Sequence, residues 1–299
     1  MLVYSILFPF IHFTSSYSFS HSLILGCIDK ASEPSLYSDR NRYIGIEVVN
    51  NMPKKYIEPP ILEAVCEFRF DPTSDWDSVI PGLIYEKVKD PFKNRRQVKD
   101  LLSLELTVGN DNIQQQLLPS DRIQFVREDE RALIQIAPHL MSVSNLKPYS
   151  SWEEFLPVIR QGFDAYLQEA KPKGLISLGL RYINRIEVPE TGITLDKYFR
   201  FYPFMENDLA GTLGAFIVGI QTFHEEGRDV LKIQLASGAV EQEGISAFVL
   251  DLDYRLLEAG KIELSGAFDW IDVAHSRVEM AFESCLTQNL RDLFEEVTE

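Results

Sequence analysis

Hydrophobic and polar residues alternate along residues 62–70 (LEAVCEFRF), which predicts a β-strand with one buried face. Successive side chains of a strand point to opposite sides of the sheet, so the positions separate into two sets. One set is entirely hydrophobic. The other contains Glu63, Glu67 and Arg69, and we expect these side chains on a polar surface.

The same alternation returns in a longer predicted strand, residues 175–188, where LRYINRIEV carries the clearest pattern. Its hydrophobic side is interrupted by Asn184, and its other side carries Arg181 and Arg185. A buried amide without a hydrogen-bond partner costs roughly 1–3 kcal/mol. We therefore expect Asn184 to bond to the backbone, at a bulge or at a helix end.

Periodicity, turn residues and capping residues predict further elements around these two strands. Before residue 174 they are a helix starting near Ser78, strands at 101–108, 121–127 and 131–137, and a helix that follows Ser150 or Ser151 and ends at Lys171-Pro172. After it they are a short helix at 195–201, strands at 213–224, 229–236 and 245–255, and a long helix at 269–295.

The predicted elements occur in the same order twice, as two tandem β-α-β-β-β-α halves. The two alternating strands are the first strand of each half, which gives halves at residues 52–173 and 174–299. Helices segregated from runs of antiparallel strands indicate an α+β fold. We expect an antiparallel sheet with the long helices packed on one face.

Residues 1–51 differ from the remainder, and we expect a disordered tail or a misassigned start outside the fold. The stretch LVYSILFPFIHF is too short to cross a bilayer and lacks the basic residues that open a signal peptide. A lipoprotein site at Cys27 is an alternative, but Leu25 is bulky where a small residue is needed. Met52 leads through PKKYIEPP directly into the first strand.

The charge balance is strongly acidic. The 299 residues include 45 Asp and Glu against 29 Lys and Arg, a formal net charge of −16. Such a charge repels phosphates and anionic lipids, so we expect neither non-specific nucleic-acid binding nor membrane binding. A local basic patch is either a phosphate site or the solvated end of a helix with the following loop. Its members are Lys87, Lys89, Lys93, Arg95, Arg96 and Lys99.

Three cysteines, Cys27, Cys66 and Cys285, are too few for a spaced metal set or a disulfide framework. Cys66 and Cys285 lie at apolar positions of a strand and a helix, where a thiol behaves as a small core residue. This usage predicts a reducing cytoplasm, and the sequence gives no reason to expect a cofactor.

The sequence contains no complete catalytic motif, and its partial clusters each have two interpretations. Residues 224–226 (HEE) lack the second histidine of a zinc-protease motif and precede a glycine, which favours a hairpin turn. Asp251 and Asp253 share one side of a strand and form either a cation site or its solvated face. His275 and Asp272 form either an acid–base pair or an ordinary surface pair on a helix.

The charged strand faces are the best lead to a site. If the first strands of the two halves pair with each other, Arg181 and Arg185 would interleave with Glu63 and Glu67. Such a ladder is worth about 0.2–1 kcal/mol per pair. Arginine forks also suit carboxylate or phosphate groups, so a ligand groove remains the alternative. The candidate binding face comprises Arg181, Arg185, Glu63, Glu67, Arg69 and Asn184.

Several stretches between residue 52 and about residue 297 resemble a sporadically distributed family of prokaryotic proteins without an established activity. They are PPILEAVCEFRF, the WEEF helix, LRYIN and FDWIDVAHSRVEMAFESCLT. The resemblance transfers no catalytic residues, but the patchy occurrence of the family resembles that of defence-associated genes. The order of elements also looks like that of SecB-like chaperones, an analogy of fold alone.

Three functions remain open from the sequence. The first is a non-enzymatic binding or regulatory protein that acts on a protein or peptide partner. The second is an accessory component of a phage-defence or toxin–antitoxin locus. The third is a small-ligand binder or enzyme that uses the charged face, for which Arg181→Ala would remove activity and leave the melting temperature nearly unchanged.

Overall fold

The computed structural model describes residues 12–15, 55–108, 113–204, 214–240 and 242–297. The chain divides into two compact units. The smaller unit, residues 1–54 and 102–119, includes strand β1 (His12–Ser15), which pairs in parallel with residues 105–108. Apart from β1, the expectation for residues 1–51 concerns residues outside the described ranges.

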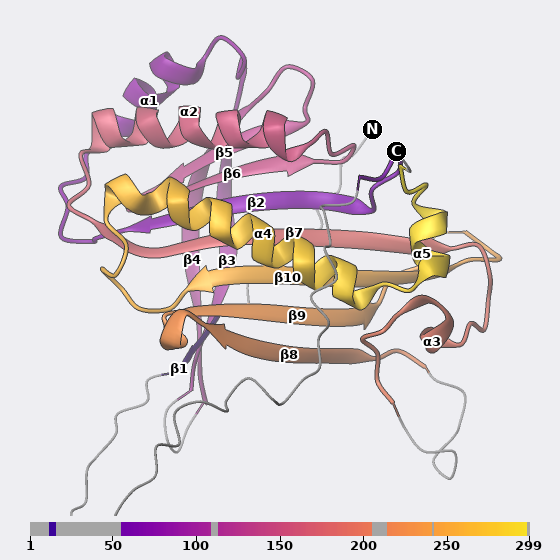
Figure 1. Cartoon of the computed structure of the whole chain (residues 1–299). Coiled ribbons are helices and arrows are strands. Elements are labelled where there is room, and N and C mark those ends of the chain that lie inside the picture. The colour runs from indigo at the N-terminus through magenta and orange to yellow at the C-terminus, as the bar shows by residue number, and fades with distance from the viewer. Residues whose placement is uncertain (1–11, 16–54, 109–112, 205–213, 241, 298–299) are drawn as a thin grey trace, which may run out of the picture. The chain divides into compact units, whose positions relative to one another are not determined.

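The larger unit, residues 55–101 and 120–299, is an α+β fold with an antiparallel sheet, as predicted (Figure 1). Its strands are β2 (Ile61–Phe70), β5 (Ala132–Ala137), β6 (Leu140–Leu146), β7 (Leu175–Val188), β8 (Ile217–His224), β9 (Asp229–Ser237) and β10 (Ser246–Leu256). Residues of β3 (Asn94–Val108) and β4 (Ile113–Val126) fall in both units. The helices are α1 (Ile80–Val88), α2 (Trp152–Ala170), α3 (Leu195–Tyr198), α4 (Ala267–Cys285) and α5 (Gln288–Leu293).

The order of the strands is symmetric about the middle of the sheet. It runs β4-β5-β6-β2-β7-β10-β9-β8, so each predicted half has its first strand at the centre and its last strand beside it. β2 and β7 pair antiparallel, with Ala64 opposite Tyr182 and Cys66 opposite Leu180. The first strands of the two predicted halves therefore meet, which is the condition on which the charged ladder depended, and we call this junction the seam.

β3 and β4 begin earlier than predicted, and two further differences concern the number of elements in the larger unit. The first half has an additional strand, β6, with the sequence LMSVSNL. Its serines, Ser142 and Ser144, are buried as well as its hydrophobic residues. The predicted final helix is two helices, α4 and α5, since Leu286 adopts an extended backbone. Leu286 forms an antiparallel bridge with Phe199, and this pairing interrupts the helix.

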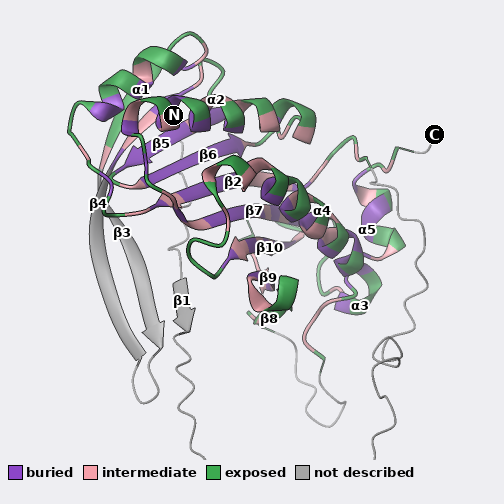
Figure 2. Cartoon of the chain, turned by 60° about the vertical axis from the view of Figure 1, so that its left-hand side comes forward, coloured by how far each residue is buried: buried purple, intermediate pink, exposed green. Residues whose placement is uncertain are grey.

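Both long helices pack on the same face of the sheet, where they bury their hydrophobic sides (Figure 2). In α2, the ring centre of Phe163 lies 4.7 Å from that of Phe68 in β2. In α4, Trp270 lies 5.4 Å from Tyr254 of β10. Ser151 caps α2 as predicted, because its side chain accepts the backbone N–H of Glu154.

Candidate functional site

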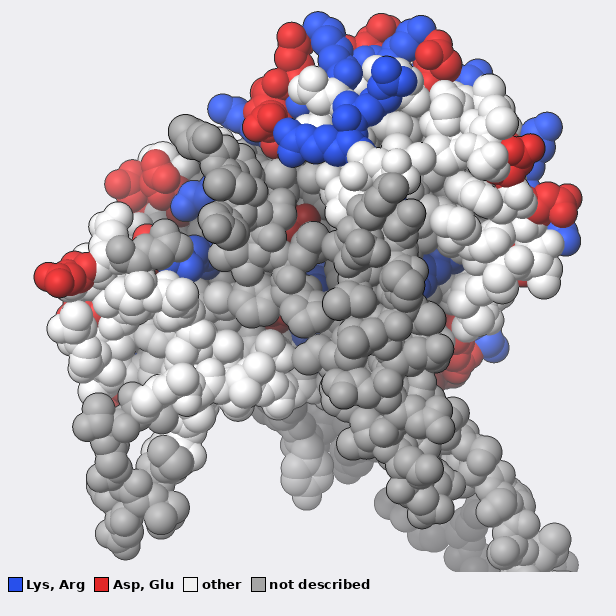
Figure 3. Space-filling model, turned by 180° about the vertical axis from the view of Figure 1, so that it is seen from behind, with Lys and Arg blue, Asp and Glu red and all other residues white. Residues whose placement is uncertain are grey.

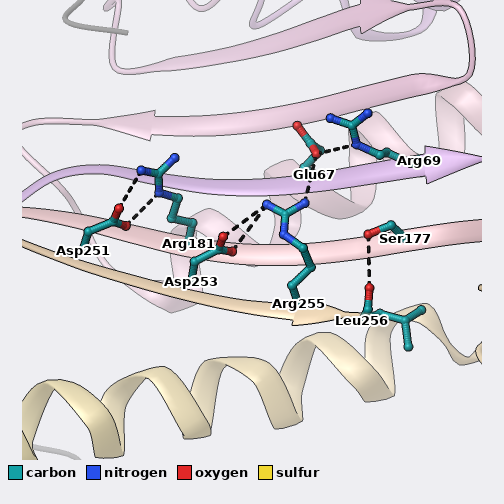
Figure 4. A network of polar contacts seen from close by, with 8 residues as sticks. All are labelled: Glu67, Arg69, Ser177, Arg181, Asp251, Asp253, Arg255 and Leu256. Carbon is teal, nitrogen blue, oxygen red and sulfur yellow. Dashed lines mark hydrogen bonds and ion pairs between the residues drawn. The ribbon is translucent and has the colours of Figure 1, made fainter. Parts of the chain in front are cut away.

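The face of the sheet opposite the helices carries a cluster of charged side chains over β2, β7 and β10 (Figure 4). We call this cluster the seam network. Its members are Glu67 and Arg69 of β2, Arg181 of β7, and Asp251, Asp253 and Arg255 of β10. Most of the network is shielded from solvent, since Glu67 is only 3% exposed and the side chains other than Arg69, which is 30% exposed, are less than 20% exposed. Charges in such a position require close partners of opposite sign.

Arg255 reaches Glu67 by crossing β7 at Gly179, which lies opposite both residues in the strand register. Arg255 Nη1 donates to Glu67 Oε1 at 3.3 Å, and Arg255 Nη2 donates to Asp253 Oδ2 at 3.3 Å. A Cβ atom at position 179 would come within 3.3 Å of the Arg255 Cζ atom. The absence of a side chain at Gly179 therefore leaves the space in which the guanidinium lies.

Arg181 forms the strongest ion pair of the network. Its Nε donates to Asp251 Oδ1 at 2.7 Å and its Nη2 donates to Asp251 Oδ2 at 2.6 Å, a bidentate geometry. Burial by itself would lower the pKa of Arg181, but the hydrogen bonds and charge of Asp251 outweigh it and raise that pKa. The guanidinium therefore stays charged and is held by this chain's own carboxylate.

The carboxylates that pair with the arginines of β7 come from other positions than the predicted ladder assumed. Arg181 and Arg185 form ion pairs with Asp251 and Glu187, where the ladder assigned them Glu63 and Glu67. Arg185 also donates from Nη2 to the carbonyl oxygen of residue 239 at 3.0 Å. Burial raises the pKa of Glu63, and the nearby Arg181 opposes this shift.

Two other candidate residues have local explanations. Arg69 donates from Nε to Glu67 Oε1 at 2.9 Å, along its own strand. Asn184 is buried on the opposite face, where its Nδ2 donates to the carbonyl oxygen of Leu250 at 3.1 Å. The bond to the backbone was expected, but it is made to β10, which pairs with β7 in regular register, and the register shift after Ile61 lies in β2 on the other side of β7. Asn184 is therefore separate from the seam network.

Three residues of the network were not assigned correctly from the sequence. Asp251 and Asp253 were expected to be a cation site or a solvated face, but both are mostly buried and ion-paired. Arg255 was not considered, although it follows the two aspartates at two-residue spacing and therefore shares their side of β10. No group of three or more His, Cys, Asp or Glu within the described ranges could hold a metal ion.

Arg122 of β4 is a further buried cation that the sequence did not indicate. It is 5% exposed, and its Nε atom has no hydrogen-bond partner in the part of the chain described. Burial lowers the pKa of Arg122, while the charge of Glu67 raises it. Although β5 and β6 lie between β4 and β2, this charge interaction links Arg122 to the seam network.

The predicted basic patch is a surface of mixed sign rather than a cluster of unpaired cations (Figure 3). Its ion pairs are Lys87–Glu169, Lys89–Glu86, Lys93–Glu128 and Arg96–Glu130. Arg95 lies over the ring of Tyr85, at 4.7 Å from its centre. This arrangement favours the solvated end of α1 and the following chain over a phosphate site.

His275 is stacked on Trp152, with ring centres 4.0 Å apart, and so joins α4 to the start of α2. Its nearest carboxylate is Glu279, whose oxygen lies 3.6 Å from Nδ1, rather than the expected Asp272. Burial lowers the pKa of His275 to about 4, although the charge of Glu153 opposes the shift. The imidazole is therefore neutral at pH 7 and packs as an aromatic ring.

Asp229, at the start of β9, is a fully buried carboxylate that no sequence pattern indicated. Its oxygens accept hydrogen bonds from Trp270 Nε1 at 3.0 Å, Tyr254 OH at 3.2 Å and Arg228 Nη2 at 2.6 Å. These donors tie β9 to β10 and α4. Asp229 has a structural role, because both of its carboxylate oxygens already accept hydrogen bonds.

β8 ends the strand order and pairs only with β9 among the strands described. Its eight residues, IVGIQTFH, contain no charge and no proline. Ile217 is 68% exposed, Phe223 65% and Ile220 45%. Natural sheets usually protect such an edge with lysine, proline or a bulge. An uncharged apolar edge of this kind is typical of surfaces that contact another chain.

Comparison with known proteins assigns no class to this arrangement. No protein-family model matches the chain, and no curated protein shows significant sequence similarity to it. The resemblance of LRYIN and its companion stretches to a prokaryotic family therefore stays a prediction. Within the described residues, no helix is both long enough and apolar enough to cross a membrane.

Proposed function

We propose that this chain is a non-enzymatic binding protein that acts on a protein or peptide partner, and that the partner adds a strand at β8. The backbone groups of an edge strand bond to an extended segment, and alternate side chains select among such segments. The observation that carries the proposal is an uncharged edge strand on which Ile217 and Phe223 are more than half exposed.

The seam network supports a protein-binding function because it argues against the alternative, a small-ligand site. A small anionic ligand at Arg181 would have to replace Asp251, which already holds the guanidinium by two short hydrogen bonds. Separating a buried pair in this way is strongly unfavourable. The described guanidinium groups of the network are thus engaged internally, which favours a structural role over an enzyme or small-ligand site.

The charge of the chain narrows the chemistry of the partner. A net charge of −16 repels acidic segments, whereas an uncharged or basic segment approaches without this penalty. The exposed apolar side chains lie on both faces of β8, with Ile220 on one and Ile217 and Phe223 on the other, which favours a partner strand with apolar residues on both faces. We place the interaction in the cytoplasm, because Cys66 and Cys285 are free thiols.

The test is capture of partners from an extract of the native host with the tagged chain. Ile220→Lys introduces a charge on the edge, and Met280→Lys introduces the same charge at a 59%-exposed position of α4. We expect a stoichiometric partner to bind the wild type and the Met280 variant but not the Ile220 variant. In the purified complex, hydrogen exchange of the backbone amides at residues 217–223 should slow.

Two results would contradict the proposal. One is a partner that binds Ile220→Lys as tightly as it binds the wild type. The other is protection from hydrogen exchange that is confined to strands other than β8.

A further inference from the structure

We propose that β8 of one copy pairs with β8 of a second copy, antiparallel and about a two-fold axis, so that two molecules share one sheet. This inference rests on the proposed function, because it uses the same edge and names its occupant. Closed two-fold dimers are the commonest symmetric assemblies, and in them one surface contacts itself. The edge must therefore be complementary to its own rotated copy.

Symmetry limits the registers that β8 can adopt with itself. A two-fold axis that joins two sheets edge to edge runs perpendicular to them, so each face continues as the same face. Opposed residues must then share a face, and since side chains alternate, the axis passes through a residue position rather than between two. The central positions of β8 that satisfy this rule are Gly219, Ile220 and Gln221.

An axis at Ile220 pairs all the exposed hydrophobic side chains of β8 with one another. Ile217 then lies opposite Phe223 of the second copy, and Ile220 lies opposite its own counterpart. An axis at Gly219 instead places Phe223 opposite residue 215, and an axis at Gln221 places it opposite Gly219. The register at Ile220 is thus the one in which every exposed apolar residue gains an apolar partner.

The same register extends the core across the axis. Ile220 lies opposite Ile233 of β9, on the face that the helices cover, and Val218 lies opposite Leu235. Ile233 and Leu235 are buried. The two copies of Ile220 would therefore continue a hydrophobic layer from one molecule into the other, and would cover the side-chain area that β8 now exposes.

The local charge at this edge permits a second copy to bind. Two chains of net charge −16 repel each other, but β8 contributes no charge to the contact. With the axis at Ile220, Glu225 lies opposite Ala215 and Glu226 lies opposite Gly214, so no acidic residue faces another. This edge therefore allows two copies to approach without opposed carboxylates along the strand.

The first test measures the oligomeric state of the purified full chain by sedimentation equilibrium. Ile220→Lys places two ammonium groups face to face across the axis, and we expect the dimer dissociation constant to rise at least about a hundredfold. Met280→Lys should leave it unchanged. An equimolar mixture of Ile220→Lys and Ile220→Glu should recover a dimer, because opposite charges then meet, and this recovery shows that both variants fold.

The second test reads the register through oxidative cross-linking. In the proposed dimer the two Cα atoms at position 220 are about 5 Å apart, within disulfide range. Those at position 218 are about 13 Å apart along the strands. Ile220→Cys should therefore form a covalent dimer and Val218→Cys should not. The parent chain, with its native cysteines, supplies the background.

Self-pairing is overturned by a wild-type chain that is monomeric throughout the accessible concentration range, or by a dimer that Ile220→Lys does not weaken. Preferential cross-linking of Val218→Cys overturns the register. A monomer that still captures another protein through β8 refutes self-pairing and leaves the proposed function standing. A β8-dependent dimer that captures no other protein supports self-pairing and contradicts the binding of a different protein at this edge.

Discussion

At the centre of the sheet, charged side chains occupy positions that solvent barely reaches, and Glu67 of the seam is only 3% exposed. At the β8 edge, Ile217 and Phe223 are more than half exposed and the strand carries no charge. The two regions thus reverse the usual distribution of polar and apolar residues. The centre can hold charge because adjacent strands supply counter-charges, as Asp251 of β10 does for Arg181 of β7. Among the strands described, β8 has a neighbour on one side only, and its apolar side chains remain exposed.

The largest effect is expected at the centre, from Arg181→Ala. This change leaves Asp251 mostly buried without its guanidinium, and breaking such a pair costs about 3 kcal/mol or more. Urea unfolding followed by circular dichroism should show this loss. The edge control, Ile220→Lys, should lower the unfolding free energy of the monomer by at most about 0.5 kcal/mol.

An unchanged melting temperature in Arg181→Ala would contradict the larger loss of stability that we expect at the centre than at the edge. The arginine would then contribute nothing to stability, and the ligand-binding interpretation of the charged face would regain its support.

An intermediate effect is expected from a buried ionisable group that lacks a strong ion pair, His275. Its pKa is lowered to about 4 in the folded chain and is about 6.5 when unfolded, so only the unfolded chain binds a proton between these values. Stability is therefore lost as the pH falls below 6.5, by about 1.4 kcal/mol at pH 5.5. In His275→Phe, which keeps the ring stack on Trp152, this loss should be absent.

The measurement is the free energy of unfolding by urea at pH 7.5 and at pH 5.5, for both chains. Burial raises the pKa of Glu279 in the folded chain, so its protonation recovers some stability in acid and offsets part of the loss. Equal pH dependence in the two chains would mean that His275 is not the group responsible.

The smallest effect is expected from Gly179→Ala at the crossing of Arg255. A methyl group 3.3 Å from the Arg255 Cζ atom must displace the guanidinium from Glu67, and we expect a loss of about 1 kcal/mol. In the Arg255→Ala background the same change should be neutral or stabilising, because alanine is favoured over glycine within a strand. A double-mutant cycle by urea unfolding measures the coupling. Additive changes in the unfolding free energy would show that Gly179 does not provide the space for the Arg255 guanidinium.

Alternation predicted the two central strands because each has one face in the core, and the pairing of β2 with β7 was the condition on which the predicted ladder depended. The ion pairs could not be predicted, since they depend on the register. Only that register places Gly179 between Glu67 and Arg255, two residues 188 positions apart in the sequence.

Strand β6 was missed for a related reason. Its Ser142 and Ser144 lie buried on the polar side of the sheet beside β2, so their polarity does not report exposure. The same surface explains why Asp251 and Asp253 resembled a solvated face.

The crossing of Arg255 over β7 also sets an order of events during synthesis. Glu67 leaves the ribosome 188 residues before Arg255, and β2 is complete more than a hundred residues before β7 begins at Leu175. In that interval the strand destined for the middle of the sheet is a temporary edge, and Glu67 has no Arg255 to pair with. The nascent chain is therefore most exposed to mispairing while its first half waits for its second.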